Sequence, residues 1–444
     1  MTLQEEYRSK LRTAEEAVRL VKSGDWVDYG SNNGFPASLD AALSERRDEL
    51  RAVKLRGNLL CGPLRTVECD PDMEHFVYHT WHCSGYERRL CDTGRAFFTP
   101  MAFRNLDSYY RRALTVDVAM LSVAPMDAEG WFSLSGALGA ERGIVEKAKI
   151  LILEVNEALP RIGTGPDCAV HLSQAECVVE AGYRPLWEMP SPAPSETDRK
   201  IAEHLLPWIP DGATLQLGIG GLPTAIGELI ADSDLKDLGM HTELCSDGYL
   251  ALHRAGKLTN RRKSLHPGQG VTGLVIGSRA LYDWVHENPE VVGAPLSVVN
   301  DPAVIGQNDR MVSLNGCLDV DLYGQVCSES AGLRQISGTG GQLDFVEGAY
   351  RSEGGRAFLC MNATYRDKAG ALHSRILPHL GGDIVTTPRS VTACIATEYG
   401  VRDLTGLSTW QRADALISLA HPDFREELIR KAEEQRIWLP HNKR

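Results

Sequence analysis

The chain has 444 residues, which is long for a single hydrophobic core and predicts two domains. Its hydrophobic content of 43% and charged content of 24% are ordinary for a soluble globular protein. The formal net charge is −12 and no long basic run occurs, which argues against a nucleic-acid partner, because phosphate backbones are bound by clustered Lys and Arg.

Cysteine usage and apolar patterning indicate a compartment. The 11 cysteines are scattered and form no C-x-x-C pair, which fits reduced thiols in a cytosol better than a disulfide framework. Residues 1–7 are polar and acidic, so no signal peptide is expected. No uncharged apolar run is long enough to span a bilayer. We therefore expect a soluble cytoplasmic protein without a membrane partner.

Helix and strand patterns alternate through the first half. They predict a helix over residues 13–21, a strand over 25–29, a turn over 30–36 and a helix over 37–43. Further strands are predicted at 53–55, 116–123 and 149–155, with a helical piece at 143–148. The nearly continuous apolar run at 149–155 is typical of a parallel strand covered on both faces. Strands separated by helices predict an α/β fold with right-handed crossovers.

The same order recurs in the second half. A helix is predicted at 198–206, a strand at 213–217, a turn at 218–223 and a helix at 224–229. Phe35-Pro36-Ala37 and Leu222-Pro223-Thr224 fall at matching places, so the order is either an internal repeat, which we favour, or a chance match. Later strands are predicted at 273–277, 296–300, 311–315 and 357–361, and a final helix at 423–435.

A proline-rich stretch marks the predicted domain boundary. Met189-Pro190-Ser191-Pro192-Ala193-Pro194-Ser195 has prolines at alternate positions, which prevent a helix and favour an extended linker. We therefore predict an N-terminal domain over residues 1–190 and a C-terminal domain over 191–444.

Two glycine-rich stretches are candidate ligand-binding loops. Gly218-Ile219-Gly220-Gly221-Leu222-Pro223 follows a predicted strand and opens a helix, where backbone N–H groups can face a phosphate. It matches neither the dinucleotide fingerprint nor the Walker loop, and a tight structural turn is the alternative. Ser337-Gly338-Thr339-Gly340-Gly341-Gln342 allows close approach of a ligand, or it is a flexible structural loop.

Two glutamates are candidate nucleophiles. Glu243 lies in the middle of a polar segment, residues 239–248, between two helix-like runs. Glu329, in Cys327-Ser328-Glu329-Ser330, competes with it on equal terms. For either residue, a solvated surface carboxylate is the alternative.

A zinc site in the first half is not expected. His75, His79, His82 and Cys83 resemble a ligand set by spacing. The strand-like residues between them, however, direct His75 and His79 to one face and His82 to the other. We therefore predict no metal site.

Together these motifs resemble those of the acetyl-CoA hydrolase/transferase family of class I CoA-transferases, especially its butyryl-CoA:acetate and 4-hydroxybutyrate CoA-transferase branch. The resemblance covers nearly the whole chain. It rests on the stretches at residues 218–223, 241–248, 337–345, 397–401 and 420–425.

The resemblance implies two similar open α/β domains, with mostly parallel sheets covered by helices and the active site between them. It implies that Glu243 is the nucleophile and that the protein is a homodimer or a tetramer of dimers. Thr339 and the segment Asn362-Ala363-Thr364 depart from the family pattern. The implied coenzyme A contacts are Gly218, Ile219, Gly220, Gly221, Leu222, Gly340, Gly341 and Thr364.

The implied activity is transfer of coenzyme A (CoA) from a short-chain acyl-CoA to acetate through a glutamyl-CoA thioester. CoA is then a substrate, and no prosthetic group is implied. Butyryl, 4-hydroxybutyryl, propionyl and succinyl groups are candidate acyl chains. Candidate acyl-pocket residues are Asn32, Asn33, Trp81 and Ser84. Two alternatives stay open: an acyl-CoA hydrolase on the same scaffold, and a non-catalytic module that binds CoA or a sugar phosphate.

Overall fold

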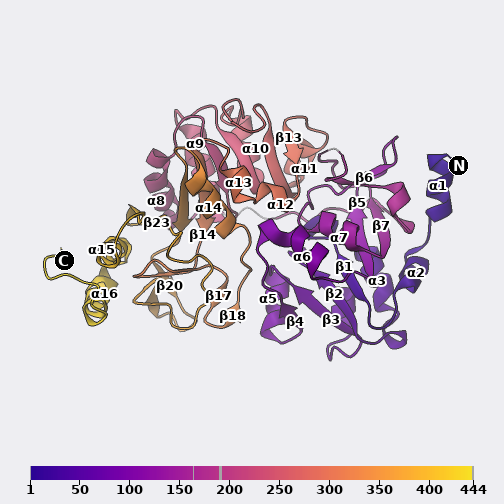
Figure 1. The fold of residues 1–444 in the computed structure, drawn as a ribbon, viewed down its shortest axis with the longest axis horizontal. Helices are drawn as coiled ribbons and strands as arrows, with labels where there is room; N and C mark the ends of the chain where they lie inside the picture. The colour runs from indigo at the N-terminus through magenta and orange to yellow at the C-terminus, as the bar shows by residue number, and fades with distance from the viewer. Residues whose placement is uncertain (1, 164, 190–192, 443–444) are drawn as a thin grey trace. The chain divides into compact units, whose positions relative to one another are not determined.

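The computed structural model describes residues 2–163, 165–189 and 193–442. They form two compact units (Figure 1). The first comprises Met1–Pro190, Glu243–Ser246 and Val271–Val299, and the second Ser191–Thr242, Asp247–Gly270 and Asn300–Arg444. The predicted domain boundary at residues 190 and 191 lies outside the described residues and stays a prediction.

A seven-stranded parallel sheet organises the first half of the chain. Its spatial order is β4-β3-β2-β1-β5-β7-β9, and every neighbouring pair is parallel. The strand order reverses between β1 and β5, which is the switch point where open α/β sheets bind ligands. The strands are β1 (Trp26–Tyr29), β2 (Val53–Gly57), β3 (Phe76–Thr80), β4 (Ala96–Phe98), β5 (Val118–Val123), β7 (Ile150–Asn156) and β9 (Cys177–Gly182).

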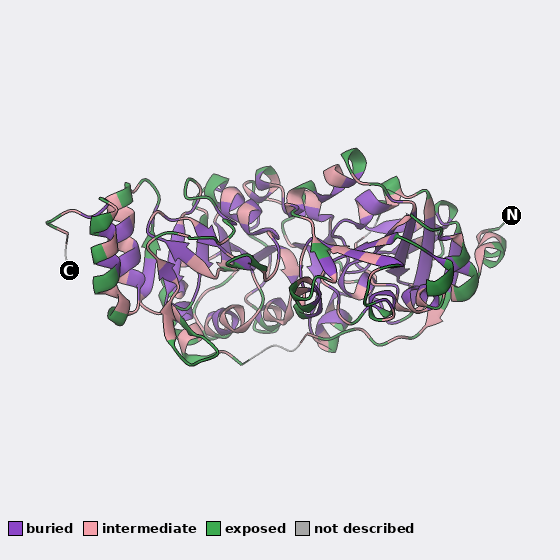
Figure 2. Cartoon of the chain, turned by 90° about the horizontal axis from the view of Figure 1, so that it is seen from below, coloured by how far each residue is buried: buried purple, intermediate pink, exposed green. Residues whose placement is uncertain are grey.

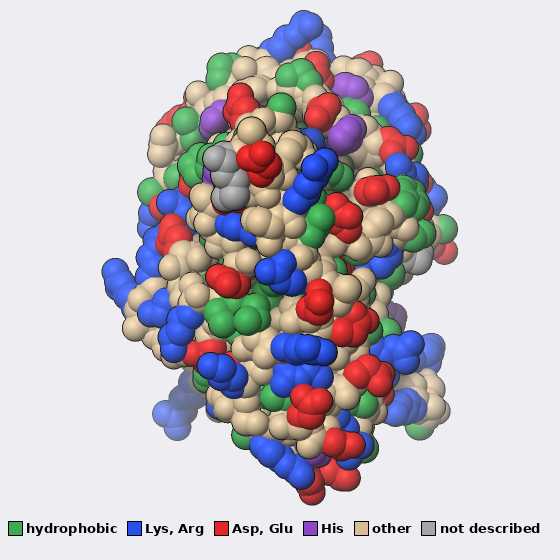
Figure 3. Space-filling model, turned by 90° about the vertical axis from the view of Figure 1, so that its right-hand side faces the viewer, with side chains coloured by type: hydrophobic (Ala, Val, Ile, Leu, Met, Phe, Trp, Pro, Cys, Tyr) green, Lys and Arg blue, Asp and Glu red, His purple; other side chains and the backbone are tan. Residues whose placement is uncertain are grey.

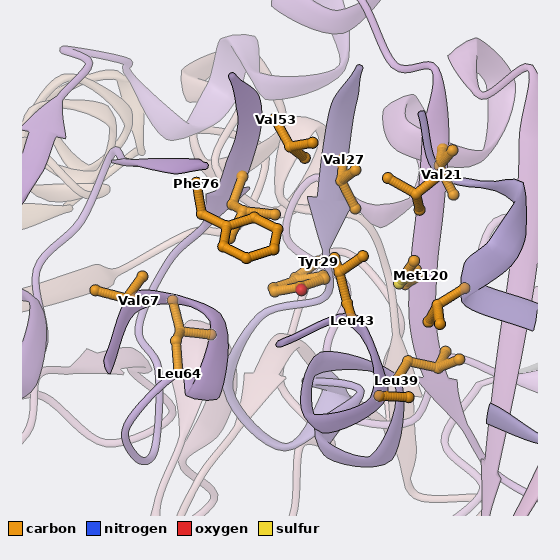
Figure 4. Packing of buried hydrophobic residues seen from close by; sticks show 14 of the residues in the cluster. Val21, Val27, Tyr29, Leu39, Leu43, Val53, Leu64, Val67, Phe76 and Met120 are labelled. Carbon is orange, nitrogen blue, oxygen red and sulfur yellow. The ribbon is translucent and has the colours of Figure 1, made fainter. Parts of the chain in front are cut away.

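The core of this sheet forms where the apolar sequence pattern predicts it. Val27 and Tyr29 of β1 are fully buried and pack with Leu39, Leu43 and Phe76 in one cluster (Figure 4). All six residues of β5 are buried, and so are the last six of β7. Since β7 lies between β5 and β9, the prediction of a parallel strand covered on both faces is confirmed.

An eight-stranded sheet contains the later strands. Its order is β13-β12-β11-β10-β14-β19-β23-β24, with β24 antiparallel to β23 at the edge. Here the order reverses between β10 and β14. The strands are β10 (Thr214–Leu217), β11 (Gly239–Cys245), β12 (Gly270–Val275), β13 (Val291–Gly293), β14 (Met311–Gly316), β19 (Arg356–Cys360), β23 (Cys394–Thr397) and β24 (Gly400–Asp403).

The remaining strands of the described residues form four small sheets. They are β16-β15-β22, β17-β18, β20-β21 and β6-β8. Their members are β6 (Trp131–Ser133), β8 (Ala169–His171), β15 (Asp319–Asp321), β16 (Val326–Cys327), β17 (Ser330–Ala331), β18 (Arg334–Gln335), β20 (Thr364–Arg366), β21 (Leu372–Ser374) and β22 (Ile376–Leu377).

Helices cover the strands, and side chains of the adjacent sequence often cap them. Thr13, Ser84 and Ser195 each begin a capping box. In this motif the N-cap side chain accepts the N–H of the residue three positions later, and the side chain of that residue accepts the N–H of the N-cap residue. The helices are α1 (Leu3–Lys10), α2 (Ala14–Ala17), α3 (Ala37–Ser44), α4 (Arg65–Glu68), α5 (Gly85–Asp92), α6 (Leu106–Arg112), α7 (Glu141–Lys147), α8 (Glu196–Leu205), α9 (Gly221–Asp232), α10 (Asp247–Arg254), α11 (Arg279–Val285), α12 (Leu296–Val299), α13 (Pro302–Ile305), α14 (Gln342–Arg351), α15 (Thr409–Leu419) and α16 (Pro422–Glu434).

The predicted fold class, α/β with two mostly parallel sheets covered by helices, is confirmed. In each sheet the strand order reverses beside the earliest strand of that half, β1 or β10, and a turn and a helix follow that strand. Buried residues concentrate in the strands, and exposed residues lie mainly on helices and loops (Figure 2). On the face drawn in Figure 3, Lys and Arg are intermixed with Asp and Glu.

Several local predictions differ from the structure, among them the strand predicted at 273–277, which is β12 (Gly270–Val275). Residues 296–300 were expected as a strand, but Leu296–Val299 is a helical turn, because Pro295 favours a helix start and its carbonyl accepts the Val298 and Val299 N–H groups. The polar segment around Glu243 is strand β11. Helix α9 begins at Gly221, three residues before its predicted start. Within the described residues, the structure contains no helix that is long and apolar enough to cross a bilayer.

Candidate active site

A half-open cavity of about 280 Å³ lies at the ends of neighbouring parallel strands. Thr214 of β10 pairs with Met311 of β14, and Val312 of β14 with Arg356 of β19, so the three strands end at one edge of the sheet. Ligands of open α/β sheets bind at this edge. The cavity is lined by Asp198, Ile201, Ile219, Gly221, Leu222, Pro223, Ile226, Leu314, Asn315, Gly316, Cys317, Cys360, Met361, Asn362 and Arg375.

The predicted glycine-rich turn forms one wall of this cavity. The Gly218 N–H donates to Leu314 O on β14 (3.0 Å), which fixes the start of the turn. Gly220 has a φ of +111°, which side chains rarely tolerate. Ile219 is 54% exposed, and Gly221 and Leu222 form the first turn of α9, where helix N–H groups lack intrahelical acceptors. The backbone here is therefore accessible to a ligand.

Sequence analysis missed Asp198, which places a carboxylate at this helix N-terminus. The Ser195 N–H and hydroxyl hold its Oδ2 at 2.9 and 2.7 Å. A Cβ on Gly221 would lie 2.6 Å from the same oxygen, so a larger residue there would force the Asp198 carboxylate to move. The Ser-x-x-Asp spacing signals a helix start but gives no sign that Asp198 faces a cavity. Asp198 attracts hydrogen-bond donors here and disfavours a phosphate beside Gly221.

Arg375 supplies the positive charge of the cavity lining. Its guanidinium donates to Leu318 O (3.0 Å), lies 3.7 Å from Asp319 Oδ1 and stacks over the Tyr365 ring at 4.7 Å. The side chain is 23% exposed. Because it is held in place and still reaches the cavity, Arg375 can face an anionic ligand group.

Glu243 lies near the carboxyl end of β11. Thr214 and Leu215 of β10 pair in parallel with Gly239 and Met240, so β11 ends at the same edge of the sheet as β10. The side chain of Glu243 is half-buried. Glu243 therefore lies toward the strand edge where ligands bind in this fold class, but it is not among the described residues that line the cavity, and its catalytic role stays a prediction.

Buried polar groups hold the first half of β11. The Met240 N–H donates to Asn260 Oδ1 (2.8 Å), and Lys263 Nζ donates to Met240 O (2.8 Å) and Gln269 O (2.7 Å). Lys263 is 5% exposed, and its stem fills the space that a side chain at Gly239 would occupy. The ring of His241 lies 6.3 Å from that of Phe345.

We expect the buried amine of Lys263 to make stability depend on pH. Burial lowers its pKa from 10.5 to about 7, so between these values the unfolded chain binds a proton that the folded chain lacks. Unfolding free energy should therefore rise with pH across this window, by on the order of 3–5 kcal/mol in total for this group. Urea unfolding at pH 7, 8 and 9 measures the rise. In Lys263→Met this contribution should disappear, and a difference between wild type and variant that is constant with pH would contradict it.

The second glycine-rich stretch precedes α14. Gly340 has a φ of +57°, and Gly341 is the N-cap residue of the helix. Gly340 and Gly341 are buried and are not among the described residues that line the cavity. Thr339, which departs from the family pattern, has its hydroxyl 3.4 Å from Glu329 Oε2.

Glu329, the competing carboxylate, is 4% exposed. Burial raises its pKa, and hydrogen bonds from Thr386, Thr339 and Gln335 act in the opposite direction. Thr364, the other predicted CoA contact, opens β20 opposite Ser374. The described lining includes Asn362, two residues earlier, but not Thr364.

The four predicted acyl-pocket residues have different surroundings. Asn32 and Asn33 lie in the turn after β1 and border a small void of about 10 Å³. Asn33 accepts the Trp187 N–H (2.8 Å) and donates to Tyr282 Oη (2.8 Å). Trp81 is 1% exposed, and Ser84 is the N-cap of α5. Asn33, Trp81 and Ser84 thus each have a structural role.

The histidines of the rejected zinc set occupy separate environments. His75 Nδ1 contacts Leu50 O (2.8 Å), the His79 ring lies against Trp26, and the His82 ring lies against Phe103. Burial lowers the pKa of His82 to about 4, so its ring is neutral at pH 7. Among the residues that the structure describes, no three His, Cys, Asp or Glu side chains form a group that could hold a metal ion.

Comparison with known proteins identifies the family. Residues 1–186 match the acetyl-CoA hydrolase/transferase N-terminal domain, and residues 277–432 match the C-terminal domain of the same name. The chain belongs to the acetyl-CoA hydrolase/transferase family. The resemblance read from the glycine-rich turns and the Glu243 segment is thereby confirmed.

Relatives of this family match over the full length. The butyryl-CoA:acetate CoA-transferase of Anaerostipes caccae is 45% identical, with 100% of both chains covered. The 4-hydroxybutyrate coenzyme A transferase of Clostridium kluyveri is 40% identical over 97% of this chain and 98% of its own. The crystal structure of RipA from Yersinia pestis has a TM-score of 0.91 at 34% identity, covering 98% of this chain and 100% of its own. These relatives confirm the predicted enzyme class, a CoA-transferase.

Proposed function

We propose that this family member transfers CoA between a short-chain acyl-CoA and acetate, with Glu243 as the nucleophile. The observation that carries the proposal is the cavity at the carboxyl ends of β10, β14 and β19, with Ile219, Gly221 and Leu222 of the glycine-rich turn in its wall. The relatives named for butyryl-CoA:acetate and 4-hydroxybutyrate transfer support butyryl and 4-hydroxybutyryl as donor groups. Propionyl and succinyl groups are further candidates.

The charges of the cavity suggest how CoA is oriented. Asp198 disfavours a phosphate beside Gly221, so this end suits a group that donates hydrogen bonds, such as an amide of the pantetheine arm or the adenine amino group. Arg375 suits an anionic phosphate. In this proposal the glycine turn lets the ligand approach the backbone closely, while Asp198 and Arg375 fix its direction.

The chemistry proceeds through covalent intermediates on Glu243. Its carboxylate attacks the thioester carbonyl carbon, forming a mixed anhydride and expelling CoA thiolate. The thiolate attacks the glutamyl carbonyl, which leaves a glutamyl-CoA thioester and releases the first carboxylate. Acetate then attacks this thioester, and the expelled thiolate takes the acetyl group to give acetyl-CoA and free Glu243. We assign the backbone N–H groups of Gly340 and Gly341 to the oxyanion of each tetrahedral intermediate.

Hydrolysis is the second candidate function, because the family description names both activities. Water attack on the anhydride or on the glutamyl-CoA thioester gives net hydrolysis. Exclusion of water from the reacting carbonyl therefore decides which activity dominates. A non-catalytic module that binds CoA or a sugar phosphate is a lesser alternative.

Trapping the intermediate tests the proposal. Wild-type protein is mixed with butyryl-CoA without an acceptor acid, and intact-mass and peptide analysis follow. We expect a CoA adduct on the peptide that holds Glu243, lost when acetate is added and absent in Glu243→Ala. Glu228→Ala, in the exposed pair of Glu228 with Arg199, is the matched control and should keep the adduct.

The other outcomes separate the alternatives. Release of free CoA without an adduct, at a rate that acetate does not change, points to a hydrolase. Neither an adduct nor CoA release, across butyryl-, 4-hydroxybutyryl-, propionyl- and succinyl-CoA, would leave a binding module as the better description. The acyl preference follows from comparing initial rates for the same four thioesters.

A further inference from the structure

A buried carboxylate lies at the base of the glycine-rich loop, which we define as residues 337–341. Glu329 stands between β16 and β17 and is 4% exposed. Burying a carboxylate is costly unless hydrogen bonds replace the lost water. The hydrogen-bond partners of Glu329 therefore indicate which part of the structure this buried carboxylate holds in place.

The side chain of Glu329 joins the glycine-rich loop to a neighbouring segment. Thr339 Oγ1, in the loop, lies 3.4 Å from Oε2 and 3.5 Å from Oε1. Thr386 Oγ1 donates to Oε1 at 3.0 Å. The N–H groups of Thr386 and Thr387 donate to Val326 O on β16, at 2.9 and 3.1 Å, so this second partner is itself fixed to a strand.

The backbone of Glu329 also fixes the entry to the loop. Its carbonyl accepts the N–H groups of Ile336 (2.8 Å) and Ser337 (3.2 Å), and the Ser337 hydroxyl lies 3.3 Å from Ser328 O. At the other end, Gln342 Nε2 donates to Thr387 Oγ1 (2.9 Å). The entry, middle and exit of the loop are thus all tied to Glu329 or to the segment that Glu329 holds.

Such anchoring matters because the loop backbone is intrinsically flexible. Gly338, Gly340 and Gly341 are three of its five residues, and Gly340 adopts a positive φ. Glycine loses more conformational freedom on folding than any other residue. Amide groups in such a loop keep one direction only if neighbouring side chains hold it.

We propose that Glu329 is a positioning residue, which holds the glycine-rich loop so that the Gly340 and Gly341 N–H groups face the reacting carbonyl. This inference rests on the proposed function, which assigns those N–H groups to the oxyanion. In this role Glu329 acts on the loop and not on the substrate. The effect of its side chain on the reaction passes through Thr339 and Thr386.

Four variants and a control test the role: Glu329→Ala, Glu329→Gln, Thr339→Val, Thr386→Val, and Glu426→Gln on the exposed face of α16. For each we measure kcat and KM for transfer from butyryl-CoA to acetate, the rate of CoA release without acetate, and the melting temperature. Misplaced donors weaken transition-state binding, so Glu329→Ala should lower kcat about 10- to 100-fold and leave KM for acetate within about twofold.

The conservative variants distinguish positioning from a merely structural role. Glu329→Gln keeps the length and one oxygen acceptor and should restore kcat to within about fivefold of wild type, and Thr339→Val should fall between it and Glu329→Ala. We also expect the ratio of hydrolysis to transfer to rise in Glu329→Ala. Glu426→Gln should match wild type in every measurement.

The proposal is overturned if kcat falls only in proportion to the folded fraction and the hydrolysis-to-transfer ratio stays at its wild-type value. If Glu329→Ala does not fold, Thr339→Val and Thr386→Val decide by the same two quantities. Absence of both transfer and CoA release in the wild-type protein counts against the proposed function. Wild-type transfer together with an unaffected Glu329→Ala counts against this inference alone.

Discussion

Replacing Glu243 with alanine is expected to lower kcat for transfer from butyryl-CoA to acetate by at least about 10⁴-fold, as loss of a residue that acts within a covalent mechanism does. In the proposed mechanism, the Glu243 carboxylate is bonded first to the acyl group and then to CoA. Initial-rate kinetics over a range of both substrates measure the loss.

Controls separate lost chemistry from lost binding or folding. Glu243→Gln removes the nucleophilic charge with little change in shape and should be nearly as inactive as Glu243→Ala. CoA affinity, measured by calorimetric titration, should stay within about fivefold in both variants, because the cavity wall at residues 219–222 is unaltered. An alanine variant that keeps a tenth of the wild-type kcat would falsify the assignment of Glu243 as nucleophile.

The second large effect concerns stability. Asp28 on β1 and Arg56 on β2 face each other across the strand pair, with Arg56 Nη2 3.0 Å from Asp28 Oδ2 and side chains 3% or less exposed. Tyr110 Oη donates to Asp28 Oδ1 (2.6 Å), and Arg56 also donates to Thr115 O (2.6 Å). Burial raises the pKa of Asp28 to about 6, and the charge of Arg56 opposes that shift.

Asp28→Ala leaves the guanidinium buried without its counter-ion and should cost about 3–5 kcal/mol of unfolding free energy.

Urea unfolding at pH 7.5, followed by tryptophan fluorescence, measures this cost. The exposed pair of Arg199 and Glu228 is the matched control, and Glu228→Ala should change stability by less than about 0.5 kcal/mol. The double variant Asp28→Leu with Arg56→Met should recover most of the loss, because apolar side chains can replace a buried ion pair. A single variant as stable as wild type, or a double variant no better than the single, would show that the pair does not carry this energy.

The fold could be predicted largely from the sequence because apolar runs and turn residues determine the strands locally. The strands predicted at 149–155, 25–29 and 213–217 correspond to β7 (Ile150–Asn156), β1 (Trp26–Tyr29) and β10 (Thr214–Leu217). Leu296–Val299 was mispredicted because the β-branched residues favour a strand, whereas the start set by Pro295 is helical. Residues 239–245 gave no strand signal, because β11 carries buried polar residues such as His241 and Thr242 within the sheet.

The candidate site could be predicted only where glycine or a family motif marks it. The turn at 218–222 was found in this way, and its residues Ile219, Gly221 and Leu222 line the cavity, whereas Gly218 and Gly220 are not among the described lining residues. Asp198, Arg375 and Lys263 carry no local signal, because their positions depend on the packing of segments distant in sequence. The Glu329 contacts join residues 10 and 57 positions away, which no spacing rule anticipates.

The turns after β1 and β10 occupy corresponding places beside the two switch points. They differ in whether protein groups or a cavity lie against them. Ser31 donates to Glu141 Oε1 through its N–H (2.8 Å) and hydroxyl (2.6 Å), and Asn32 donates to Gly136 O (3.2 Å), so the protein itself satisfies the first turn. The turn after β10 instead leaves the backbone of residues 219–222 along a cavity. Ligand binding contributes free energy to whichever part of a chain it contacts. Saturation with CoA should therefore protect amide hydrogens around β10 and α9 from solvent exchange more than those around β1 and α3.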